Sequence, residues 1–363
     1  MQRRLGKALR SDRFLTRKTS TPIIIQETDV YYKATAADHE TGTLPKEVLA
    51  QINEAIKADG FALVSGLVSE ETRELLLPTI TEDVNIVRAN ANGELTPHEQ
   101  HTGVGHLQLG LRRYSPYVRT DLAANPLIES VVAEVLGQGA WLGFYNGNVN
   151  CPGSTSQPLH FDRPYSWKTK EQAEADGQTW PPPTTTLSCS VAFADITAET
   201  GATEIYPGSH RETEVATWTT NRLKERPDLL EEWGPPARME IPAGSVCFRD
   251  PRMWHRGVPN LSDRPRAMLG LTYHSARGNH WRGRIVHVVS PEDQVQLDDD
   301  PALKLMDEGG VGDGRLIFHS SARFAIEKES LHGVNRNINF VDEEVNHLVN
   351  AHNRGGAHVE KAE

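Results

Sequence analysis

Two short segments of this 363-residue sequence combine imidazole and carboxylate side chains at spacings that suit a metal site. In QPLHFDRP, residues 157–164, His160 and Asp162 lie two positions apart and would share one face of a β-strand. RDPRMWHRGVPN, residues 249–260, places His255 at the edge of a predicted strand. Two imidazoles and one carboxylate form the facial ligand set of non-haem Fe(II), which leaves three coordination positions open. Each segment alone also suits structural or surface residues, so this interpretation requires tertiary folding to join them.

A third candidate residue is Arg266, at the start of an apolar strand predicted over residues 266–273. A guanidinium that enters a protein interior needs an anion, because an unpaired buried charge is strongly unfavourable. A bound dicarboxylate would supply that anion through a bidentate contact. Arg264 lies two residues earlier and would share the same strand face. For either arginine, a surface ion pair is the alternative.

The elements that would position these residues are mainly short strands. Apolar runs separated by Pro and Gly lie at residues 141–150, 187–196, 245–250 and 266–273. The runs lack the intervening helices of a parallel sheet, so an antiparallel sandwich or barrel is favoured. Two insertions, at 165–183 and 212–237, suit either lids over a site or plain surface loops.

Three helices are predicted before these strands. Apolar spacing predicts the first over residues 45–60, with Pro45 in its first turn and Gly60 at its end. A strand over 61–68 follows, and Ser69 caps the second helix. The third helix has Asn125 as its cap and ends at Gly137.

Composition limits the class of protein. Hydrophobic residues make up 37% of the chain, which predicts a globular protein. The net charge of −11 disfavours nucleic-acid binding, although the first 18 residues are basic. No stretch approaches the ~18 apolar residues of a membrane helix. Cys151, Cys189 and Cys247 are few and widely spaced, which predicts buried strand positions in a reducing compartment. We therefore expect a cytoplasmic protein with no nucleic-acid or membrane partner, and the oligomeric state is left open.

Four segments, taken in order, resemble the phytanoyl-CoA dioxygenase family of Fe(II)- and 2-oxoglutarate-dependent oxygenases. HFDRP resembles the family's HxD segment, and DGFALVSGLVSEE, residues 59–71, resembles its N-terminal strand and helix. ADITAETGATEIYPGSHR, residues 194–211, resembles the hairpin before the distal histidine. MWHRGVPNLSDRPRAMLGLTY, residues 253–273, resembles the distal histidine and arginine segment. An ordered set of four segments is more specific than any one of them.

The resemblance implies a mainly β fold with flanking helices and a double-stranded β-helix core, a jelly roll of cupin-like type. A single oxygenase domain would cover residues 45–290. Residues 1–44 would form an N-terminal extension, with its basic start disordered. Residues 291–363 would form a C-terminal extension whose end is also disordered.

The resemblance also implies roles for individual residues. The positions that match the family's iron ligands are His160, Asp162 and His255. Arg266 matches the arginine that binds the distal carboxylate of 2-oxoglutarate, and Arg264 takes that position in some relatives. Gln157 matches a glutamine that contacts the metal-side carboxylate of the cosubstrate in some members. Capping of backbone groups is the alternative role for Gln157.

The activity implied is oxidation, foremost hydroxylation, of a small organic molecule with Fe(II), 2-oxoglutarate and O2, yielding succinate and CO2. Halogenation is disfavoured, because halogenating relatives replace the carboxylate at the position of Asp162 with a small residue. Desaturation, epoxidation and cyclisation remain alternatives with the same ligand set. Two hypotheses come from other functional classes. One is a non-catalytic jelly-roll binding protein, and the other is a cupin-type metalloenzyme that does not use 2-oxoglutarate.

Several other histidines and tryptophans could be mistaken for residues of the active site. His210 follows a Pro-Gly turn and is expected to be structural. The HEQH segment, residues 98–101, lacks the four-residue histidine spacing of a zincin helix, so with His106 it is expected in a polar loop near the cavity. Trp167 and Trp180 suit an apolar lid over the substrate or aromatic packing within a loop.

Overall fold

A computed structural model describes residues 23–25, 32–109, 120–218, 223–276, 331–332 and 334. The predicted basic start, the expected domain end at 290 and almost all of the expected C-terminal extension lie outside the described residues. Within the described ranges, no helix has the length and apolar character needed to cross a membrane.

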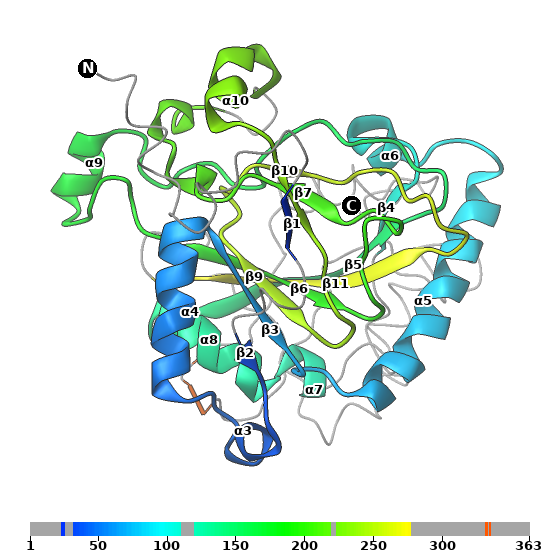
Figure 1. The fold of residues 1–363 in the computed structure, drawn as a ribbon, viewed down its shortest axis with the longest axis horizontal. Helices are drawn as coiled ribbons and strands as arrows, with labels where there is room; N and C mark the ends of the chain where they lie inside the picture. The colour runs from blue at the N-terminus through cyan, green and yellow to red at the C-terminus, as the bar shows by residue number, and fades with distance from the viewer. Residues whose placement is uncertain are drawn as a thin grey trace, which may run out of the picture.

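The larger of two sheets contains seven strands (Figure 1). They are β2 (Tyr32–Lys33), β3 (Phe61–Ser65), β4 (His106–Leu109), β5 (Trp141–Asn150), β6 (Thr186–Ala192), β9 (Val246–Arg249) and β11 (Arg266–His274). Their order is β2-β3-β9-β6-β11-β5-β4. All neighbouring pairs in this sheet are antiparallel except β2 and β3.

The smaller sheet contains four strands. Its strands are β1 (Ile23–Ile25), β7 (Thr203–Ile205), β8 (Ala237–Met239) and β10 (His255–Arg256). They lie in the order β1-β8-β7-β10, with β1 parallel to β8 and the other pairs antiparallel. An isolated bridge joins His160 to His255, so the HxD segment extends this sheet beyond β10.

The path of the chain identifies the fold. From β5 onward it alternates between the sheets: β5 in the larger, the His160 bridge in the smaller, and β6 in the larger. It continues through β7 and β8 in the smaller sheet, β9 in the larger, β10 in the smaller and β11 in the larger. This antiparallel alternation is a double-stranded β-helix, and it confirms the predicted jelly-roll class.

Helices flank the β core. The α-helices are α3 (Ala36–Thr41), α4 (Lys46–Asp59), α5 (Glu70–Ala91), α6 (Pro97–Thr102), α7 (Thr120–Ala123), α8 (Pro126–Leu136), α9 (Lys170–Ala175) and α10 (Pro227–Trp233). Short 3-10 turns are η3 (Ser209–Arg211), η4 (Thr213–Val215) and η5 (Leu223–Glu225). Figure 1 shows α4 beside α8, with α5 along the opposite edge of the molecule.

The three predicted helices form where their capping residues indicated. Ser69 accepts a hydrogen bond from the Thr72 amide at the start of α5. Asn125 accepts from two backbone amides at the start of α8. Gly60 ends α4 with φ of 85°, a left-handed conformation that glycine adopts without steric cost.

The main core lies between the larger sheet and helices α4 and α8. Along β6, Leu187, Cys189 and Val191 are buried in this core, and each such apolar side chain contributes roughly 1.5–3 kcal/mol. The alternate residues Ser188 and Ser190 are half-exposed on the other face. All three cysteines are buried and unpaired with one another, as predicted.

Three local features differ from the sequence expectations. Strands β1 and β2 precede residue 45, yet β1 belongs to the smaller sheet and β2 to the larger one. Residues 97–102 form α6 rather than a loop, because Thr96 and Glu99 form a reciprocal capping box and Pro97 suits the first helical position. His160 makes only an isolated bridge and is not within a regular strand.

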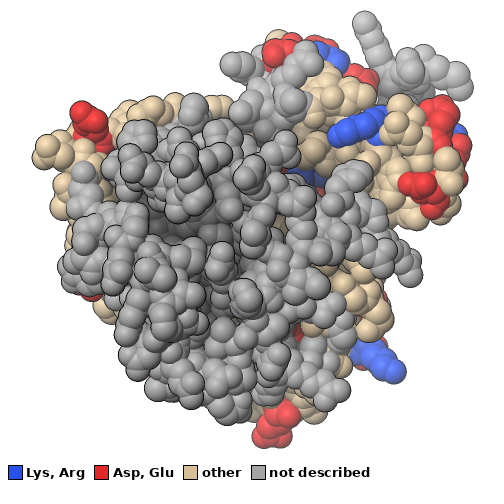
Figure 2. Space-filling view, turned by 180° about the vertical axis from the view of Figure 1, so that it is seen from behind, with Lys and Arg blue, Asp and Glu red and all other residues tan. Residues whose placement is uncertain are grey.

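Charged side chains of both signs are visible on the face opposite to that in Figure 1. Figure 2 shows acidic and basic side chains interspersed at the margins of that view. The described margin therefore presents charges of both signs.

Candidate metal centre

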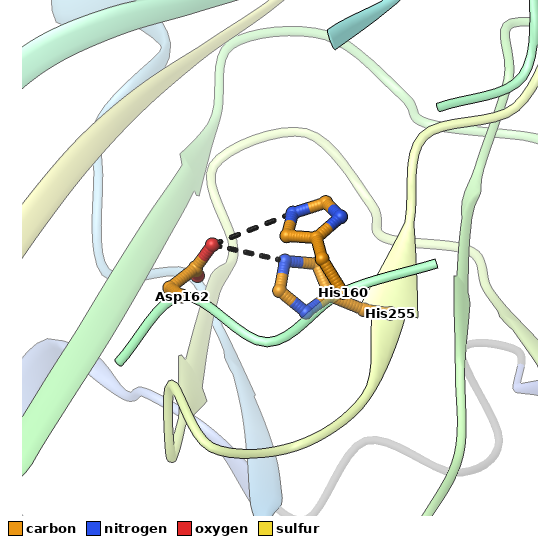
Figure 3. A group of neighbouring side chains, drawn as sticks. All are labelled: His160, Asp162 and His255. Atoms are coloured by element: carbon orange, nitrogen blue, oxygen red, sulfur yellow. Dashed lines mark ion pairs between the residues drawn. The ribbon is translucent and has the colours of Figure 1, made fainter. Parts of the chain in front are cut away.

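His160, Asp162 and His255 converge at the edge of the smaller sheet (Figure 3). One potential ligand atom from each residue lies within 4.8 Å of the others. Oδ1 of Asp162 is 3.5 Å from Nε2 of His160 and 3.4 Å from Nε2 of His255. Neighbouring ligand atoms around a first-row metal ion lie about 3 Å apart, so small side-chain adjustments would suffice. Within the described ranges, this is the only cluster of three His, Cys, Asp or Glu side chains with such spacing.

Backbone hydrogen bonds hold the three ligand positions together. The His160 amide donates to the His255 carbonyl at 3.1 Å, and the His255 amide donates back at 2.9 Å. The Asp162 amide donates to the Pro251 carbonyl at 2.8 Å. The two ligand-bearing segments, 95 residues apart in sequence, are thus joined by their main chains before any metal is considered.

The ring contacts of His160 favour the tautomer that a metal requires. Nδ1 of His160 lies 2.7 Å from the Pro158 carbonyl oxygen, which can only accept, so Nδ1–H donates and Nε2 keeps its lone pair toward Asp162. Nδ1 of His255 lies between two groups of opposite character, the Met253 carbonyl oxygen at 2.9 Å and Nη1 of Arg249 at 3.1 Å. Burial lowers the pKa of His255 to about 4, which keeps this imidazole neutral at pH 7.

Arg249 orients the carboxylate of the cluster. Its Nη2 donates to Oδ2 of Asp162 at 2.6 Å, which leaves Oδ1 facing the imidazoles. Burial opposes ionisation, but the neighbouring His255 and Arg249 hold the pKa of Asp162 well below its usual value. The sequence analysis did not select Arg249, although an arginine ending the apolar run VCFR was a signal of a buried charge.

Arg266 is buried at the start of β11. Its side chain is 6% exposed, and Nη2 donates to the Gly201 carbonyl at 3.2 Å, while Nε has no partner. Burial lowers its pKa to about 10, and no described carboxylate forms an ion pair with it. An unsatisfied interior guanidinium fits the carboxylate of a bound dicarboxylate. Arg264 is instead exposed, and its backbone carbonyl accepts hydrogen bonds from Asn260 and Ser262.

Gln157 and His106 lie near the same end of the fold. The amide of Gly257 donates to Oε1 of Gln157 at 2.8 Å, so this side chain caps a backbone group beside His255. His106 begins β4 and is buried, with Nε2 2.7 Å from the Thr155 carbonyl oxygen. Burial lowers the pKa of His106, and the positive charge of Arg266 adds to that effect. The expected loop position of His106 is therefore wrong, because it lies in a strand.

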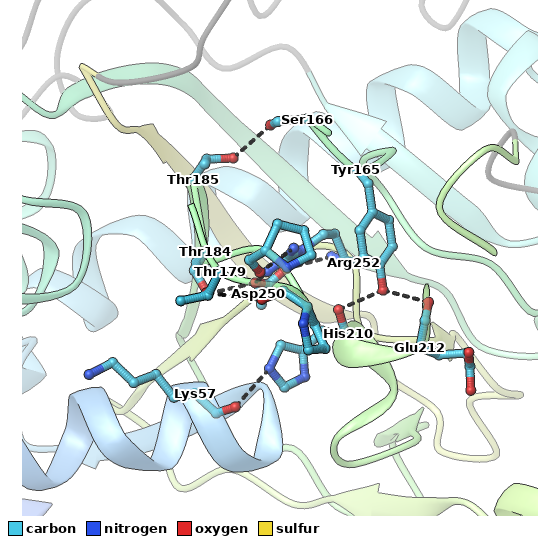
Figure 4. Close-up of polar contacts among 12 residues, drawn as sticks. Lys57, Tyr165, Ser166, Thr179, Thr184, Thr185, His210, Glu212, Asp250 and Arg252 are labelled. Atoms are coloured by element: carbon cyan, nitrogen blue, oxygen red, sulfur yellow. Dashed lines mark hydrogen bonds and ion pairs between the residues drawn. The ribbon is translucent and has the colours of Figure 1, made fainter. Parts of the chain in front are cut away.

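A buried ion pair supports the turn that precedes His255 (Figure 4). Nη2 of Arg252 lies 2.6 Å from Oδ2 of Asp250, and Thr184 donates to that oxygen at 2.7 Å. The Arg252 guanidinium also donates to the Pro182 carbonyl at 3.0 Å and lies over the ring of Tyr165, 4.9 Å from its centroid. These contacts attach the first insertion to the turn whose Pro251 carbonyl holds Asp162.

His210 belongs to this supporting structure and not to the metal cluster. Its ring is 2% exposed, and Nε2 lies 3.2 Å from the Lys57 carbonyl oxygen at the end of α4. Burial lowers the pKa of His210 to about 4. Tyr165 donates to the His210 carbonyl at 2.6 Å and to the Glu212 carbonyl at 2.8 Å, so its hydroxyl links the start of the second insertion to the first (Figure 4).

The tryptophans of the first insertion pack within the protein. Trp167 is buried and donates from Nε1 to Asp176 at 2.7 Å inside the same insertion. Trp180 packs against an apolar cluster that includes Trp254 and Trp233. Trp167 is thus held within its own loop, whereas Trp180 packs against residues outside that loop.

Comparison with known proteins identifies the family. The phytanoyl-CoA dioxygenase (PhyH) family matches residues 56–268, more than half of the chain. This chain belongs to the phytanoyl-CoA dioxygenase family. The resemblance to this family in the sequence is therefore confirmed. The protein is a dioxygenase that depends on Fe(II) and 2-oxoglutarate, and its His-Asp-His donor set fits that metal.

Similar proteins include other dioxygenases. The chain is 27% identical to the ectoine dioxygenase of Bordetella bronchiseptica over 241 residues, which is 61% of this chain and 74% of the relative. It is 23% identical to dioxygenase trt7 of Aspergillus terreus, over 61% of this chain and 72% of the relative. Among solved structures, the non-heme alpha ketoglutarate dependent epimerase SnoN aligns with a TM-score of 0.44 and 18% identity, covering 64% of this chain and 82% of SnoN.

Proposed function

We propose that this phytanoyl-CoA dioxygenase family member hydroxylates a small organic molecule. In this proposal His160, Asp162 and His255 hold Fe(II). The observation that carries it is the meeting of three ligand atoms within 4.8 Å of one another, on a jelly roll whose interior also contains an unsatisfied guanidinium. Iron, 2-oxoglutarate and dioxygen supply the oxidation, in which a substrate C–H becomes C–OH and 2-oxoglutarate becomes succinate and CO2.

Arg266 is proposed to bind the distal carboxylate of 2-oxoglutarate. Its burial and its unpartnered Nε support this role, because a carboxylate would satisfy a charge that the described protein leaves unpaired. Arg264 is the less suited alternative, since its side chain is exposed. Gln157 already accepts a hydrogen bond at Oε1, so its amide nitrogen remains to donate to the metal-side carboxylate.

Protein groups around the iron act by positioning. Arg249 directs one oxygen of Asp162 to the metal, and the main-chain bridge between His160 and His255 sets the spacing of the imidazoles. Asp162 occupies a coordination position that halogenation would need for halide, so halogenation is not proposed. Desaturation, epoxidation and cyclisation share this ligand set and are the alternative outcomes.

Succinate formation tests the activity. Purified protein with Fe(II), ascorbate and 2-oxoglutarate should bind the cosubstrate and release succinate, with a candidate substrate gaining one oxygen atom by mass spectrometry. Asp162→Ala should abolish iron-dependent turnover, while Asp263→Ala, at an exposed aspartate, should leave it unchanged. An Asp162→Ala rate equal to that of the wild type would remove this residue from the metal site.

The same measurements separate the other classes of function. A non-catalytic jelly-roll binding protein would bind small molecules without releasing succinate. A cupin-type metalloenzyme without 2-oxoglutarate would bind iron but show no calorimetric binding of the cosubstrate. A product that has two hydrogen atoms fewer than the substrate, in place of one additional oxygen atom, would indicate desaturation or cyclisation.

A further inference from the structure

The register of the larger sheet shows which side chains face the metal cluster. Directly opposite residues on neighbouring strands point to the same face. Arg249, whose guanidinium contacts Asp162, is opposite Ser188 of β6. Ser188 is opposite Thr272 of β11, which is opposite Phe144 of β5. These residues form one row on the face of the sheet that is turned toward the metal cluster, which we call the site face.

The site face continues along the same strands, because residues two positions apart on a strand point to the same side. Ser190 and Gly270 form the next pair across β6 and β11. Beyond them, Asn148 of β5 is opposite Met268 of β11 on one side and Gln108 of β4 on the other. The site face therefore extends over four neighbouring strands (Figure 1).

The smaller sheet lies over the site face. Cys247 of β9 is opposite Ser190, and its Sγ is 3.2 Å from Sδ of Met239 in β8. Cys247 is fully buried there, as is Ala192, which is opposite Met268. Beside these two residues the sheets are in close contact.

Solvent nevertheless reaches the centre of the site face. On the opposite face of the same strands, Leu187, Cys189 and Leu271 are at most 1% exposed. The partly exposed side chains of the site face are Gln108, Asn148, Ser188, Ser190, Met268 and Thr272. Exposure on a covered face requires a space between the two sheets, so these residues line an internal hollow.

Most of the side chains that line this hollow are polar, uncharged and unpaired. Within the ranges that the structure describes, no side-chain hydrogen bond is formed by Gln108, Asn148, Ser188, Ser190 or Thr272. Carboxamides and hydroxyls both donate and accept, so they match the hydroxyl groups of a ligand, which do the same. A hydrocarbon chain in the hollow would leave these groups unsatisfied, which disfavours its binding.

Gly270 leaves space at the floor of the hollow. It lies in the middle of β11 and pairs regularly with both β5 and β6. Its φ is outside the left-handed region, so its backbone conformation does not require glycine. A glycine inside a strand weakens that strand and often marks the close approach of a ligand. The missing side chain therefore provides room against the sheet, beside Ser190.

The hollow has room for a substrate next to the cosubstrate. Its lining spans four strands, about 14 Å at the usual strand spacing, and a five-carbon diacid is shorter than this. With 2-oxoglutarate held at Arg266, the part over Gly270 and Thr272 is left free. This part is in the same row as Arg249, the neighbour of the metal cluster. Phe144, partly exposed in that row, adds an apolar surface.

We propose that the substrate binds over Gly270 and is a ring compound with several neutral hydroxyl groups, such as a sugar or cyclitol unit. The inference rests on the proposed function and names its substrate class. The hydroxyls of Ser188, Ser190 and Thr272 bind the hydroxyls of the ring, and Phe144 packs against its C–H face. A fatty acyl chain is excluded from this class, because it would satisfy only the apolar part of the lining.

Cysteine labelling tests whether ligands reach the hollow. Ser190→Cys places a thiol on the site face, and Val191→Cys places one on the fully buried face of the same strand. With Mn(II) in place of iron and 2-oxoglutarate bound, a small methanethiosulfonate should label Ser190→Cys about 10-fold faster or more, because labelling of a buried thiol requires local opening. The wild type, whose three cysteines are buried, gives the background.

Protection from this labelling identifies the substrate class. A set of methyl glycosides and cyclitols is compared with octanoate and octanoyl-CoA, all on the Ser190→Cys protein with Mn(II) and 2-oxoglutarate bound. We expect at least one hydroxylated ring compound to slow the labelling in a saturable manner. Neither octanoate nor octanoyl-CoA should slow it.

Second substitutions in the Ser190→Cys protein assign the contacts. Gly270→Ala should weaken the protecting compound about 10-fold or more, because the added methyl group fills the floor of the hollow. Thr272→Val removes a hydroxyl at nearly constant shape and should weaken it about 2- to 10-fold. Thr179→Val, at an exposed threonine, is the matched control and should have no effect. Unchanged 2-oxoglutarate affinity by calorimetry shows that each variant is folded.

Four outcomes would overturn the inference. They are equal labelling of Ser190→Cys and Val191→Cys, no protection by any hydroxylated ring compound, equal protection by octanoate or octanoyl-CoA, and undiminished protection in Gly270→Ala. Failure of the proposed function gives a different result. In that case the wild type would neither bind 2-oxoglutarate nor release succinate, while the contrast between Ser190→Cys and Val191→Cys, measured without metal or cosubstrate, would remain.

Discussion

Arg249 and Asp162 are 87 residues apart in sequence, yet Nη2 of the arginine lies 2.6 Å from Oδ2 of the aspartate. The guanidinium therefore occupies one carboxylate oxygen and leaves the other toward His160 and His255 (Figure 3). Because Arg249 is 8% exposed, water competes little for this contact. The ion pair sets the orientation of the only carboxylate in the metal cluster.

Removal of this guanidinium should weaken iron binding. Arg249→Gln leaves Asp162 free to rotate, so we expect the Fe(II) dissociation constant to rise about 10- to 100-fold, the range seen for groups that orient metal ligands. Anaerobic equilibrium dialysis measures this constant directly. Arg226→Gln, which breaks an exposed ion pair elsewhere, is the matched control. Equal iron affinity in Arg249→Gln and the control would contradict the orienting role.

Separate substitution of the two candidate arginines should affect 2-oxoglutarate binding unequally. Arg266→Gln is expected to raise the dissociation constant of 2-oxoglutarate about 10- to 100-fold, because a buried charge-assisted contact is lost. Arg264→Gln should leave the constant unchanged, since that side chain is exposed. Calorimetry on the metal-loaded protein gives both values. A loss confined to Arg264→Gln would transfer the cosubstrate role to Arg264.

Removal of one member of the buried pair Asp250–Arg252 should destabilise the protein more than removal of both. Arg252→Gln leaves Asp250, which is 1% exposed, without its counter-charge, so we expect a loss of about 3–5 kcal/mol in the free energy of unfolding. Asp250→Asn combined with Arg252→Gln should be less destabilised than Arg252→Gln alone. Urea denaturation followed by tryptophan fluorescence provides the comparison. A double variant less stable than the single one would argue against the stranded charge as the cause.

Acid should destabilise the protein partly through His210. Its pKa in the folded protein is lowered to about 4, against an ordinary value of 6.5. Between these values the unfolded chain binds a proton that the folded chain does not. The free energy of unfolding therefore falls as pH drops from 6.5 to about 4, by up to about 1.4 kcal/mol per pH unit for this group.

His210→Gln tests this contribution. Gln can keep a donor toward the Lys57 carbonyl but does not titrate, so the variant should lose less stability than the wild type across that window. Buried His255 and His274, whose pKa values are also lowered, act in the same direction in both proteins. Denaturant titrations at several pH values between 4 and 7.5 give the two slopes. Parallel slopes would exclude His210 as a source of acid sensitivity.

Local structure was largely predictable from short-range chemistry. Ser69 and Asn125 start helices because their side chains satisfy free backbone amides, and Gly60 ends one because it tolerates a positive φ. The apolar run at residues 187–196 predicted a strand, and β6 forms there. These inferences depend on contacts or patterns within a few residues. The order of four such segments along the chain also indicated the family that residues 56–268 match.

Contacts between residues that are far apart in the sequence were revealed only by the tertiary structure. Sequence spacing named His160, Asp162 and His255, but their convergence depends on the bridge between the HxD segment and β10. The sequence alone could not show that Arg249 would orient Asp162, or that His106 would lie in a strand near Arg266. Such contacts join residues many tens of positions apart. Their free energy comes from burial and charge pairing that exist only once both sheets have closed around the site.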